Sequence, residues 1–346
     1  MVAKCSQHRG RPRKPSAARR RNVRQRASET STWRHRPPSL RGPGPLNPTG
    51  GDTVNCVAIK TKELHAKLGR RGPYGVDTGD LGFTGSPGAV FVPRDAPSPA
   101  PIVAWAHDWT KGPQYYTDTL KHLASWGFVV VAPATDRGGR PNHQQFADNL
   151  SAAIEDTLQA RLGRGKVRAD PRRIAVAGHG LGGGVAALLA SQRTDIDAVA
   201  MVFPAETVPS AAQRAMLIDA PGLLLSASGG VRGEDAAALQ LAWRGDLVHR
   251  RLEKAIESGL VERNSLIGQV GLADPDRRTQ RTVRPLVAGY LLATLGGDDD
   301  YAAFADPDTK LKDTELISEE KLAEEAEELV PSAPPLLKLV KGFTGG

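Results

Sequence analysis

A glycine-rich turn in the middle of the chain has the form that presents a catalytic nucleophile. Residues 173–189 read RIAVAGHGLGGGVAALL, which predicts a short strand, a sharp turn and a helix. In the G-x-S-x-G pattern of such a turn, the central serine is held in a strained backbone conformation with its hydroxyl exposed. Here the five residues are GHGLG, so Gly180 stands at the serine position. The sequence therefore predicts the setting of a nucleophile without the nucleophile.

This replacement is compatible with folding of the turn. A side chain in the unfavourable backbone conformation costs about 1–3 kcal/mol, and glycine avoids that cost. Gly182 and Gly183 still allow the helix to pack closely on the strand. We therefore expect the turn to form at Gly180 although its chemistry is lost.

The elements that would position this turn are predicted from the hydrophobic pattern. Apolar residues at helical spacing indicate helices around residues 116–123, 146–162 and 279–295, and an acidic helix over 315–330. Between the helical segments lie short apolar runs that read as strands, which indicates a mostly parallel central sheet with helices on both faces, an α/β fold. These runs are residues 89–92, 102–106, 128–132, 174–177, 198–203 and 223–226.

Charge and composition divide the chain into four parts. Residues 1–50 carry thirteen Lys or Arg and one acidic residue, a net charge of +12, and should form a disordered basic leader. Residues 51–87 are a lead-in segment, 88–306 the α/β domain, and 307–346 an acidic helical and Pro-rich tail. The tail could pack on its own domain or on a partner, and we favour the first.

The leader and the composition bear on partners and location. A basic arm can bind nucleic acid through counterion release, but no aromatic interleaving or binding domain accompanies this one, so we favour an incidental extension. No secretory segment and no apolar run of roughly 18 residues is present, so we expect a cytoplasmic protein without a membrane span. Cys5 and Cys56 provide neither a disulfide framework nor a core nucleophile. We expect no cofactor and no metal site, because His107 with Asp108 is too small a ligand set.

Four motifs occur in a fixed order around the turn: PIVAWAHDW at 101–109, LKHLASWGFVVVAP at 120–133, GHGLGG at 178–183 and YAAF at 301–304. In this order they resemble the α/β-hydrolase superfamily, and within it the dienelactone hydrolase and bacterial cutinase or polyester hydrolase branch. There the counterparts are an H-G-[FWY] oxyanion loop, a helix and strand, a G-H-S-x-G-G elbow and a closing segment. The resemblance covers about two thirds of the chain, from about Gly88 to Asp306, and implies an α/β-hydrolase fold.

The same resemblance implies a triad in the order serine, acid, histidine, and all three positions are altered. The acid should follow the strand that ends near Ser226, where this chain has Gly230. The histidine should follow the next strand, where this chain has Glu257, and no histidine follows His249. Because a serine nucleophile needs an imidazole to take its proton and a carboxylate to orient that imidazole, we predict no serine-hydrolase activity.

A binding pocket could survive this loss. The resemblance assigns the oxyanion hole to the backbone N–H groups of Trp109 and Leu181, which could hold a small acyl, ester or carboxylate ligand. Asp108 places a charge where glycine is customary, so it could repel an incoming carboxylate or cap the loop. His179 is expected to pack and hydrogen-bond beside the pocket. The other histidines of this region have no motif context and are expected at the surface: His65, His122, His143 and His249.

Three functions remain open. The first, which we favour, is a non-catalytic binding protein that uses the pocket. The second is a hydrolase of altered mechanism, in which Glu257 activates a water held in the space that Gly180 leaves, provided that its carboxylate is desolvated. The third is an interaction protein that uses the basic leader or the acidic tail.

Overall fold

A computed structural model describes residues 61–85, 87–135, 138–263 and 275–329 of the chain. The expected leader (1–50), the start of the lead-in segment (51–60) and the Pro-rich end of the tail (330–346) lie outside the described residues.

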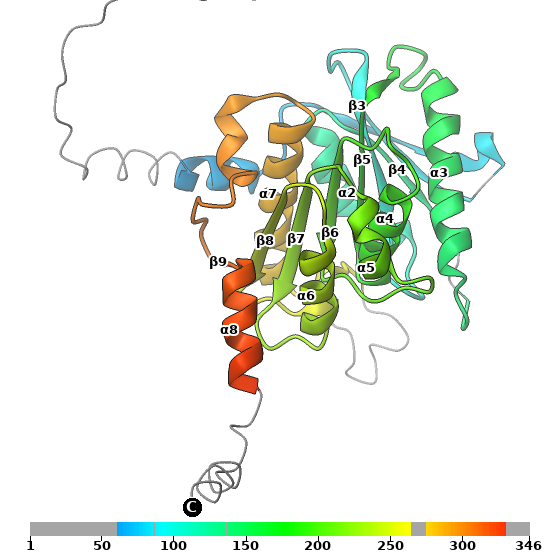
Figure 1. Cartoon of the computed structure of the whole chain (residues 1–346). Helices are drawn as coiled ribbons and strands as arrows, with labels where there is room; N and C mark the ends of the chain where they lie inside the picture. Colours follow the sequence, from blue (N-terminus) through cyan, green and yellow to red (C-terminus); the bar gives the residue numbers. More distant parts are fainter. Residues whose placement is uncertain (1–60, 86, 136–137, 264–274, 330–346) are drawn as a thin grey trace, which may run out of the picture. The chain divides into compact units, whose positions relative to one another are not determined.

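The centre of the fold is a nine-stranded sheet (Figure 1). The order across it is β1-β2-β4-β3-β5-β6-β7-β8-β9, with parallel pairing from β4 to β8 and antiparallel pairing at both edges. All six strands that the apolar runs predict are present. The strands are β1 (Val76–Asp80), β2 (Gly88–Pro93), β3 (Ala100–Ala106), β4 (Val129–Pro133), β5 (Ala169–His179), β6 (Ala198–Val202), β7 (Gly222–Ala227), β8 (Leu247–Leu252) and β9 (Thr314–Leu316).

Helices cover both faces of this sheet, as the sequence predicts (Figure 1). The longer ones are α2 (Thr117–Ser125), α3 (His143–Gln159), α4 (Leu181–Ala190), α6 (Gly233–Ala242), α7 (Arg277–Thr294) and α8 (Glu319–Leu329). The shorter ones are α5 (Ala211–Arg214) and the 3₁₀ turns η1 (Leu81–Thr84), η2 (Pro113–Tyr115), η3 (Ala215–Leu217), η4 (Glu257–Leu260) and η6 (Asp299–Phe304).

The sheet separates two hydrophobic clusters. Phe146 of α3, Val185 of α4 and Leu239 of α6 pack on one face, and Leu120 of α2 and Leu286 of α7 pack on the other. Both faces of the parallel strands are therefore buried, which explains why these strands are apolar runs rather than alternating patterns. The fold is an α/β fold with a mostly parallel sheet.

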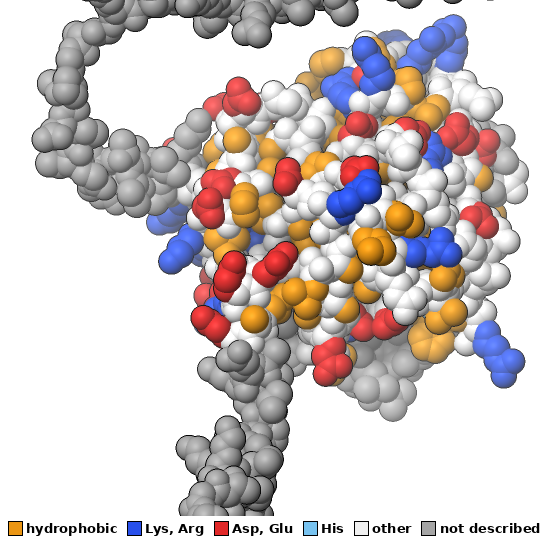
Figure 2. Space-filling model, viewed as in Figure 1, with side chains coloured by type: hydrophobic (Ala, Val, Ile, Leu, Met, Phe, Trp, Pro, Cys, Tyr) orange, Lys and Arg blue, Asp and Glu red, His pale blue; other side chains and the backbone are white. Residues whose placement is uncertain are grey.

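The sheet extends beyond residues 88–306 on both sides. β1 lies in the expected lead-in segment, and β9 pairs with β8 where the acidic helix was expected to start at Glu315. The helix begins instead at Glu319, because residues 314–316 add an edge strand to the sheet. Arg251 on β8 pairs with Glu325 of α8 at 2.6 Å, and Figure 2 shows acidic side chains gathered around β9 and the start of α8. The described part of the tail thus packs on the sheet edge.

No helix among the described residues is long and apolar enough to cross a membrane. Among the same residues, no group of three or more His, Cys, Asp or Glu side chains is arranged to hold a metal ion.

Candidate functional site

The glycine-rich turn has the backbone of a nucleophile elbow. Gly180 lies between the end of β5 and the start of α4, with φ 58° and ψ −123°. This left-handed φ is costly for a residue with a side chain and free for glycine. The Gly180 N–H donates to the carbonyl of Val202 at 2.9 Å, which fixes the turn against the end of β6.

The space beside Gly180 is filled by the side chain of Asp108. A Cβ atom built on Gly180 would lie 2.1 Å from Oδ1 of Asp108 and 2.6 Å from a guanidinium nitrogen of Arg232. The same Oδ1 accepts a hydrogen bond from the backbone N–H of Leu181 at 2.8 Å. One carboxylate therefore occupies both the nucleophile's place and the donor that would stabilise an oxyanion.

The charge on Asp108 is stabilised in place. Its side chain is only 14% exposed, and Arg232 approaches its Oδ2 at 3.5 Å. Burial alone would raise the pKa of Asp108, but the Arg232 guanidinium and hydrogen bonds from the N–H groups of Leu181 and Trp109 favour the charged form, and the pKa lies below its ordinary value. Both N–H groups that the resemblance assigns to the oxyanion hole thus serve the protein's own carboxylate.

A second glycine and carboxylate pair lies next to the first. A Cβ atom on Gly230 would lie 2.2 Å from Oε1 of Glu257, so the Glu257 side chain takes the space where a triad acid would begin. That oxygen accepts a hydrogen bond from the backbone N–H of Arg232 at 2.9 Å. The structure therefore brings Gly230 and Glu257 together, and Arg232 joins them to Asp108.

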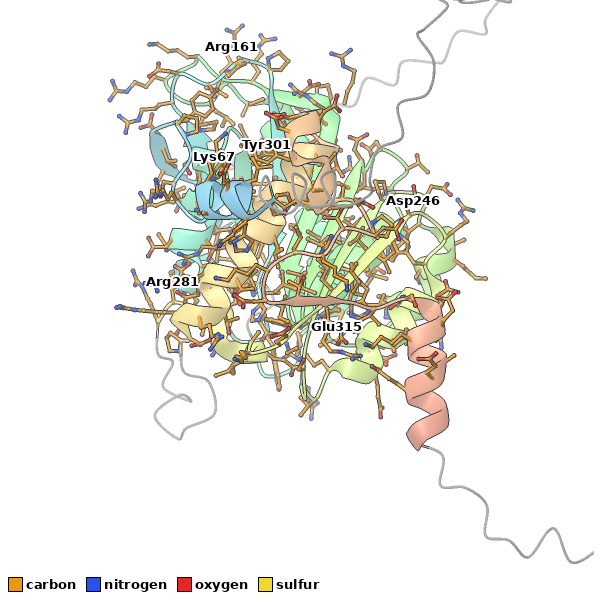
Figure 3. All side chains as sticks on the ribbon, turned by 90° about the vertical axis from the view of Figure 1, so that its left-hand side faces the viewer. Lys67, Arg161, Asp246, Arg281, Tyr301 and Glu315 are labelled. Carbon is orange, nitrogen blue, oxygen red and sulfur yellow. The ribbon has the colours of Figure 1, made fainter. Side chains whose placement is uncertain are left out.

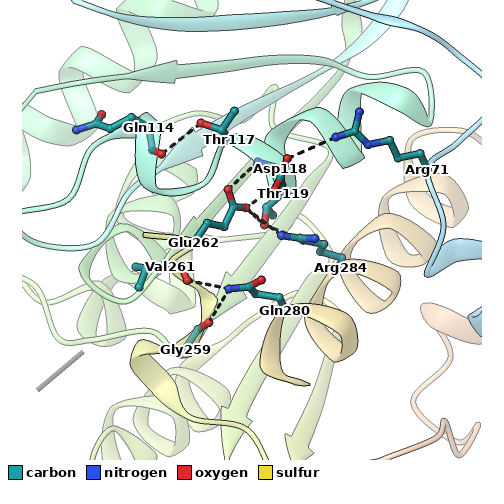
Figure 4. A network of polar contacts seen from close by, with 10 residues as sticks. All are labelled: Arg71, Gln114, Thr117, Asp118, Thr119, Gly259, Val261, Glu262, Gln280 and Arg284. Atoms are coloured by element: carbon teal, nitrogen blue, oxygen red, sulfur yellow. Dashed lines mark hydrogen bonds and ion pairs between the residues drawn. The ribbon is translucent and has the colours of Figure 1, made fainter. Parts of the chain in front are cut away.

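The segment that carries Glu257 is pinned to the fold by a polar network (Figure 4). The carboxylate of Glu262 accepts from the backbone N–H groups of Asp118 and Thr119 at 2.7 Å each, at the start of α2, where a helix N-terminus favours negative charge. Arg284 of α7 pairs with the same carboxylate at 3.0 Å. Gln280 of α7 donates to the carbonyls of Gly259 and Val261. Glu257 is thus carried by an anchored segment.

His179 connects these segments from inside the core. It is fully buried, its Nδ1 accepts from the Tyr116 hydroxyl at 2.9 Å, and its Nε2 donates to the carbonyl of Glu257 at 2.7 Å. The Tyr116 oxygen in turn accepts from the backbone N–H of Asp108 at 3.1 Å. Burial lowers the pKa of His179 despite the nearby Asp108 carboxylate, so the ring is neutral at pH 7. Both ring nitrogens are engaged, and the residue orders the loops.

Arg232 is the member of this site that the sequence reasoning missed. It lies in the turn after β7, two residues beyond Gly230, where the resemblance implied only a missing acid. Asp108 was recognised as an unusual charge, and a buried carboxylate needs a cationic partner. This need for a cationic partner was the signal in the sequence that pointed to an arginine or lysine beside Asp108. Trp109, by contrast, is 48% exposed, and its indole donates to the carbonyl of Gly138.

A second buried cluster corrects the expectation that His249 lies at the surface. His249 is 4% exposed, and its Nε2 lies 2.7 Å from the hydroxyl of Ser226 on the adjacent strand β7. Its Nδ1 bonds to Oε1 of Gln240 on α6, and Gln240 donates to the carbonyl of Ile317. Burial lowers the pKa of His249 to about 3. His122 is also 4% exposed, which is again contrary to expectation.

The mostly parallel sheet, the helices on both of its faces and the elbow after β5 are those of an α/β-hydrolase fold. Residues 83–209 match the model of the chlorophyllase family. Cutinase est2 of Thermobifida alba is 30% identical over 168 residues, which is 48% of this chain and 51% of that protein. Cutinase 2 of Thermobifida cellulosilytica is 33% identical over 169 residues, 48% of this chain and 58% of that protein. Cutinase cut1 of Thermobifida fusca is 33% identical over 169 residues, 48% of each chain.

The chain is therefore similar to ester hydrolases of the α/β-hydrolase fold, and among them to bacterial cutinases, as the motifs indicated. The chain spans about half the length of the cutinases that it matches.

Proposed function

We propose that this protein is a non-catalytic α/β-hydrolase-fold protein that acts by binding rather than by ester hydrolysis. The observation that carries the proposal is the Asp108 carboxylate, which accepts from the Leu181 N–H at 2.8 Å and fills the space beside Gly180. A substrate carbonyl polarised by the elbow would have to displace a charged, paired side chain. No nucleophile stands at Gly180 to attack it.

The position of Asp108 also ranks the classes of ligand that the elbow could bind. An ester or acyl carbonyl must compete with Asp108 for the same N–H groups, and a carboxylate must in addition overcome the repulsion between like charges. Of the acyl, ester and carboxylate ligands that the pocket was expected to hold, the carboxylate is the least favoured here.

Turnover of short-chain aryl esters by the purified full chain tests the proposal. We expect rates near background for the wild type and for Gly180→Ser, because the variant restores a hydroxyl without the histidine and acid that activate it. The matched variant Gly180→Ala should give the same rate as Gly180→Ser. Turnover of several per second by the wild type would overturn the proposal.

The alternative is hydrolysis by a water that Glu257 activates. It requires a water beside Gly180, and the Asp108 carboxylate lies in that space. If this route operates, Glu257→Gln removes the base at nearly constant size, and any measurable turnover falls by about 10² to 10⁴. Under our proposal the residual rate does not respond to this change.

A further inference from the structure

A cavity of about 740 Å³ opens at the end of the sheet opposite to the elbow. Trp126, which lines it, precedes β4, whereas Gly180 follows β5, and both strands run parallel to β3. Because the two strands point the same way, the amino end of β4 and the carboxyl end of β5 lie at opposite ends of the sheet's strands. The volume is within the usual range of about 300–1,000 Å³ for sites that bind small molecules.

Aromatic side chains from three separate parts of the chain form the walls. Tyr74 follows the helix that covers residues 61–68, Trp126 follows α2, and Tyr301 lies in η6. The rings of Trp126 and Tyr301 meet edge to face with their centres 6.4 Å apart. Leu292 of α7 adds an aliphatic surface. Such walls suit a flat apolar group.

The backbone holds this wall in place. Gly72 donates its N–H to the Ser125 hydroxyl at 2.8 Å, and Tyr74 donates to the Ser125 carbonyl at 3.1 Å. A Cβ atom on Gly72 would lie 2.2 Å from that carbonyl oxygen, so the two segments touch through their main chains. The aromatic wall is therefore built on two segments that are tied together.

Cations outnumber carboxylates around the opening. The charged lining residues are Lys67, Arg70, Arg71, Glu63 and Asp298. The Lys67 ammonium lies 6.0 Å from the centre of the Trp126 ring and 5.5 Å from that of Tyr301, and Figure 3 shows Lys67 and Tyr301 close together. Within the described residues, Arg70 forms no ion pair. Lys67 covers these ring faces, which a cationic ligand would seek. Arg71 is paired with Asp118, and Asp298 and Asp300 lie near Lys67, so among the described lining residues Arg70 is the cation best able to meet an anion.

We propose that this cavity binds a small planar aromatic carboxylate, with its ring against Trp126 and Tyr74 and its carboxylate at Lys67 and Arg70. This site is separate from the elbow and goes beyond the proposed function. It assigns a ligand class to the end of the sheet that lies opposite to the catalytic positions of the fold.

Calorimetric titration of the full chain with 1-naphthoate, beside the neutral 1-naphthalenemethanol, tests the proposal. We expect a Kd for naphthoate on the order of 1 mM and weaker binding of the alcohol. Lys67→Met and Arg70→Met should each weaken naphthoate binding roughly 3- to 10-fold and change alcohol binding by less than about twofold. Leu292→Trp, which replaces the aliphatic wall by a bulkier ring and narrows the cavity, should weaken binding of both. Melting midpoints check that each variant folds.

Two controls locate the ligand. Arg161→Met removes an exposed cation that lies away from the Lys67–Tyr301 pair, so the affinity should not change (Figure 3). Asp108→Asn removes the negative charge at the elbow, and it too should leave the affinity unchanged. Tighter binding in Asp108→Asn would place naphthoate at the elbow and overturn the proposal. Absence of binding, or equal binding of acid and alcohol, would overturn it as well.

Discussion

Two buried clusters of this protein contain the components of a hydrolytic site in different states. The elbow has the backbone of such a site, with the left-handed turn at Gly180 and the N–H groups beside it. The side chains of Asp108 and Arg232 occupy the space where a nucleophile and a substrate would lie. Between β7 and α6 the side chains are kept, because Ser226, His249 and Gln240 form a hydrogen-bonded row, but the serine lies within a strand and is 5% exposed. Neither cluster joins an activated nucleophile to an accessible oxyanion site.

A set of residue types is therefore not by itself a catalytic site. A general base works best with a pKa near the working pH, and burial holds that of His249 at about 3. At the elbow, each of the two glycines, Gly180 and Gly230, faces a carboxylate from another segment. Asp108 fills the space at Gly180, and Glu257 fills the space at Gly230. The glycines and the carboxylates are complementary in space, and together with Arg232 the two carboxylates form a charged cluster.

The largest expected effect separates both clusters from an active serine. An activated serine reacts stoichiometrically with a fluorophosphonate, and removing a triad lowers turnover by about 10⁶. We expect no adduct on the wild type, and none on Gly180→Ser. Mass spectrometry of the intact chain and its peptides checks this, with an active cutinase as the positive control. An adduct on Ser226 would contradict this expectation, since that serine would then be activated and accessible to the probe.

The residues that the sequence did and did not reveal differ in the range of their interactions. The strands and the turn at Gly180 follow from local patterns, since β-branched runs and adjacent glycines determine them. The position of Arg232 beside Asp108 depends on contacts between residues 124 positions apart, which no local pattern encodes. β9 was missed for a related reason, because residues 314–316 become a strand only by pairing with β8. Burial of His249 likewise depends on Gln240 from a different element.

The next effect concerns the acid response of His249. Its folded pKa of about 3 lies below the ordinary 6.5, so the unfolded chain binds a proton first as the pH falls. The free energy of unfolding should therefore drop by about 1.4 kcal/mol per pH unit below pH 6.5 on account of this group. His249→Gln removes that dependence, so its destabilisation relative to wild type should shrink from pH 7 to pH 5 in urea titrations.

Ser226→Ala is the matched control for this pH response. It removes the hydroxyl partner but keeps the buried imidazole, so the steep acid response should persist. If the His249→Gln penalty were instead independent of pH, the imidazole would titrate freely in the folded protein and could act as a base.

A smaller effect tests whether Gly180 and Asp108 are complementary. Gly180→Ala should lower the free energy of unfolding by about 1–3 kcal/mol through backbone strain, with an added cost for displacing Asp108. Gly229→Ala is the matched control, because Gly229 also has a positive φ, 69°, but a Cβ there meets no atom within 4 Å. In the background Asp108→Gly, the penalty of Gly180→Ala should fall towards that of the control. Strict additivity of the two changes in denaturant titrations would contradict the pairing.

The smallest expected effect isolates the charge of Asp108. Asp108→Asn keeps an oxygen that can accept from the Leu181 N–H but removes the attraction to Arg232. Because this ion pair is 3.5 Å long and partly exposed, we expect a loss of about 1 kcal/mol at pH 7. Because the folded pKa of Asp108 lies below the ordinary 3.8, its stabilisation is present above that pH and disappears as the pH falls through the folded value. The difference between wild type and variant should therefore close at low pH. Asp118→Asn, whose pair with Arg71 is 61% exposed on both sides, should change stability little at any pH. A variant more stable than wild type at pH 7 would mean that burial of the Asp108 charge costs more than its partners return, and that the elbow is occupied at the expense of the fold.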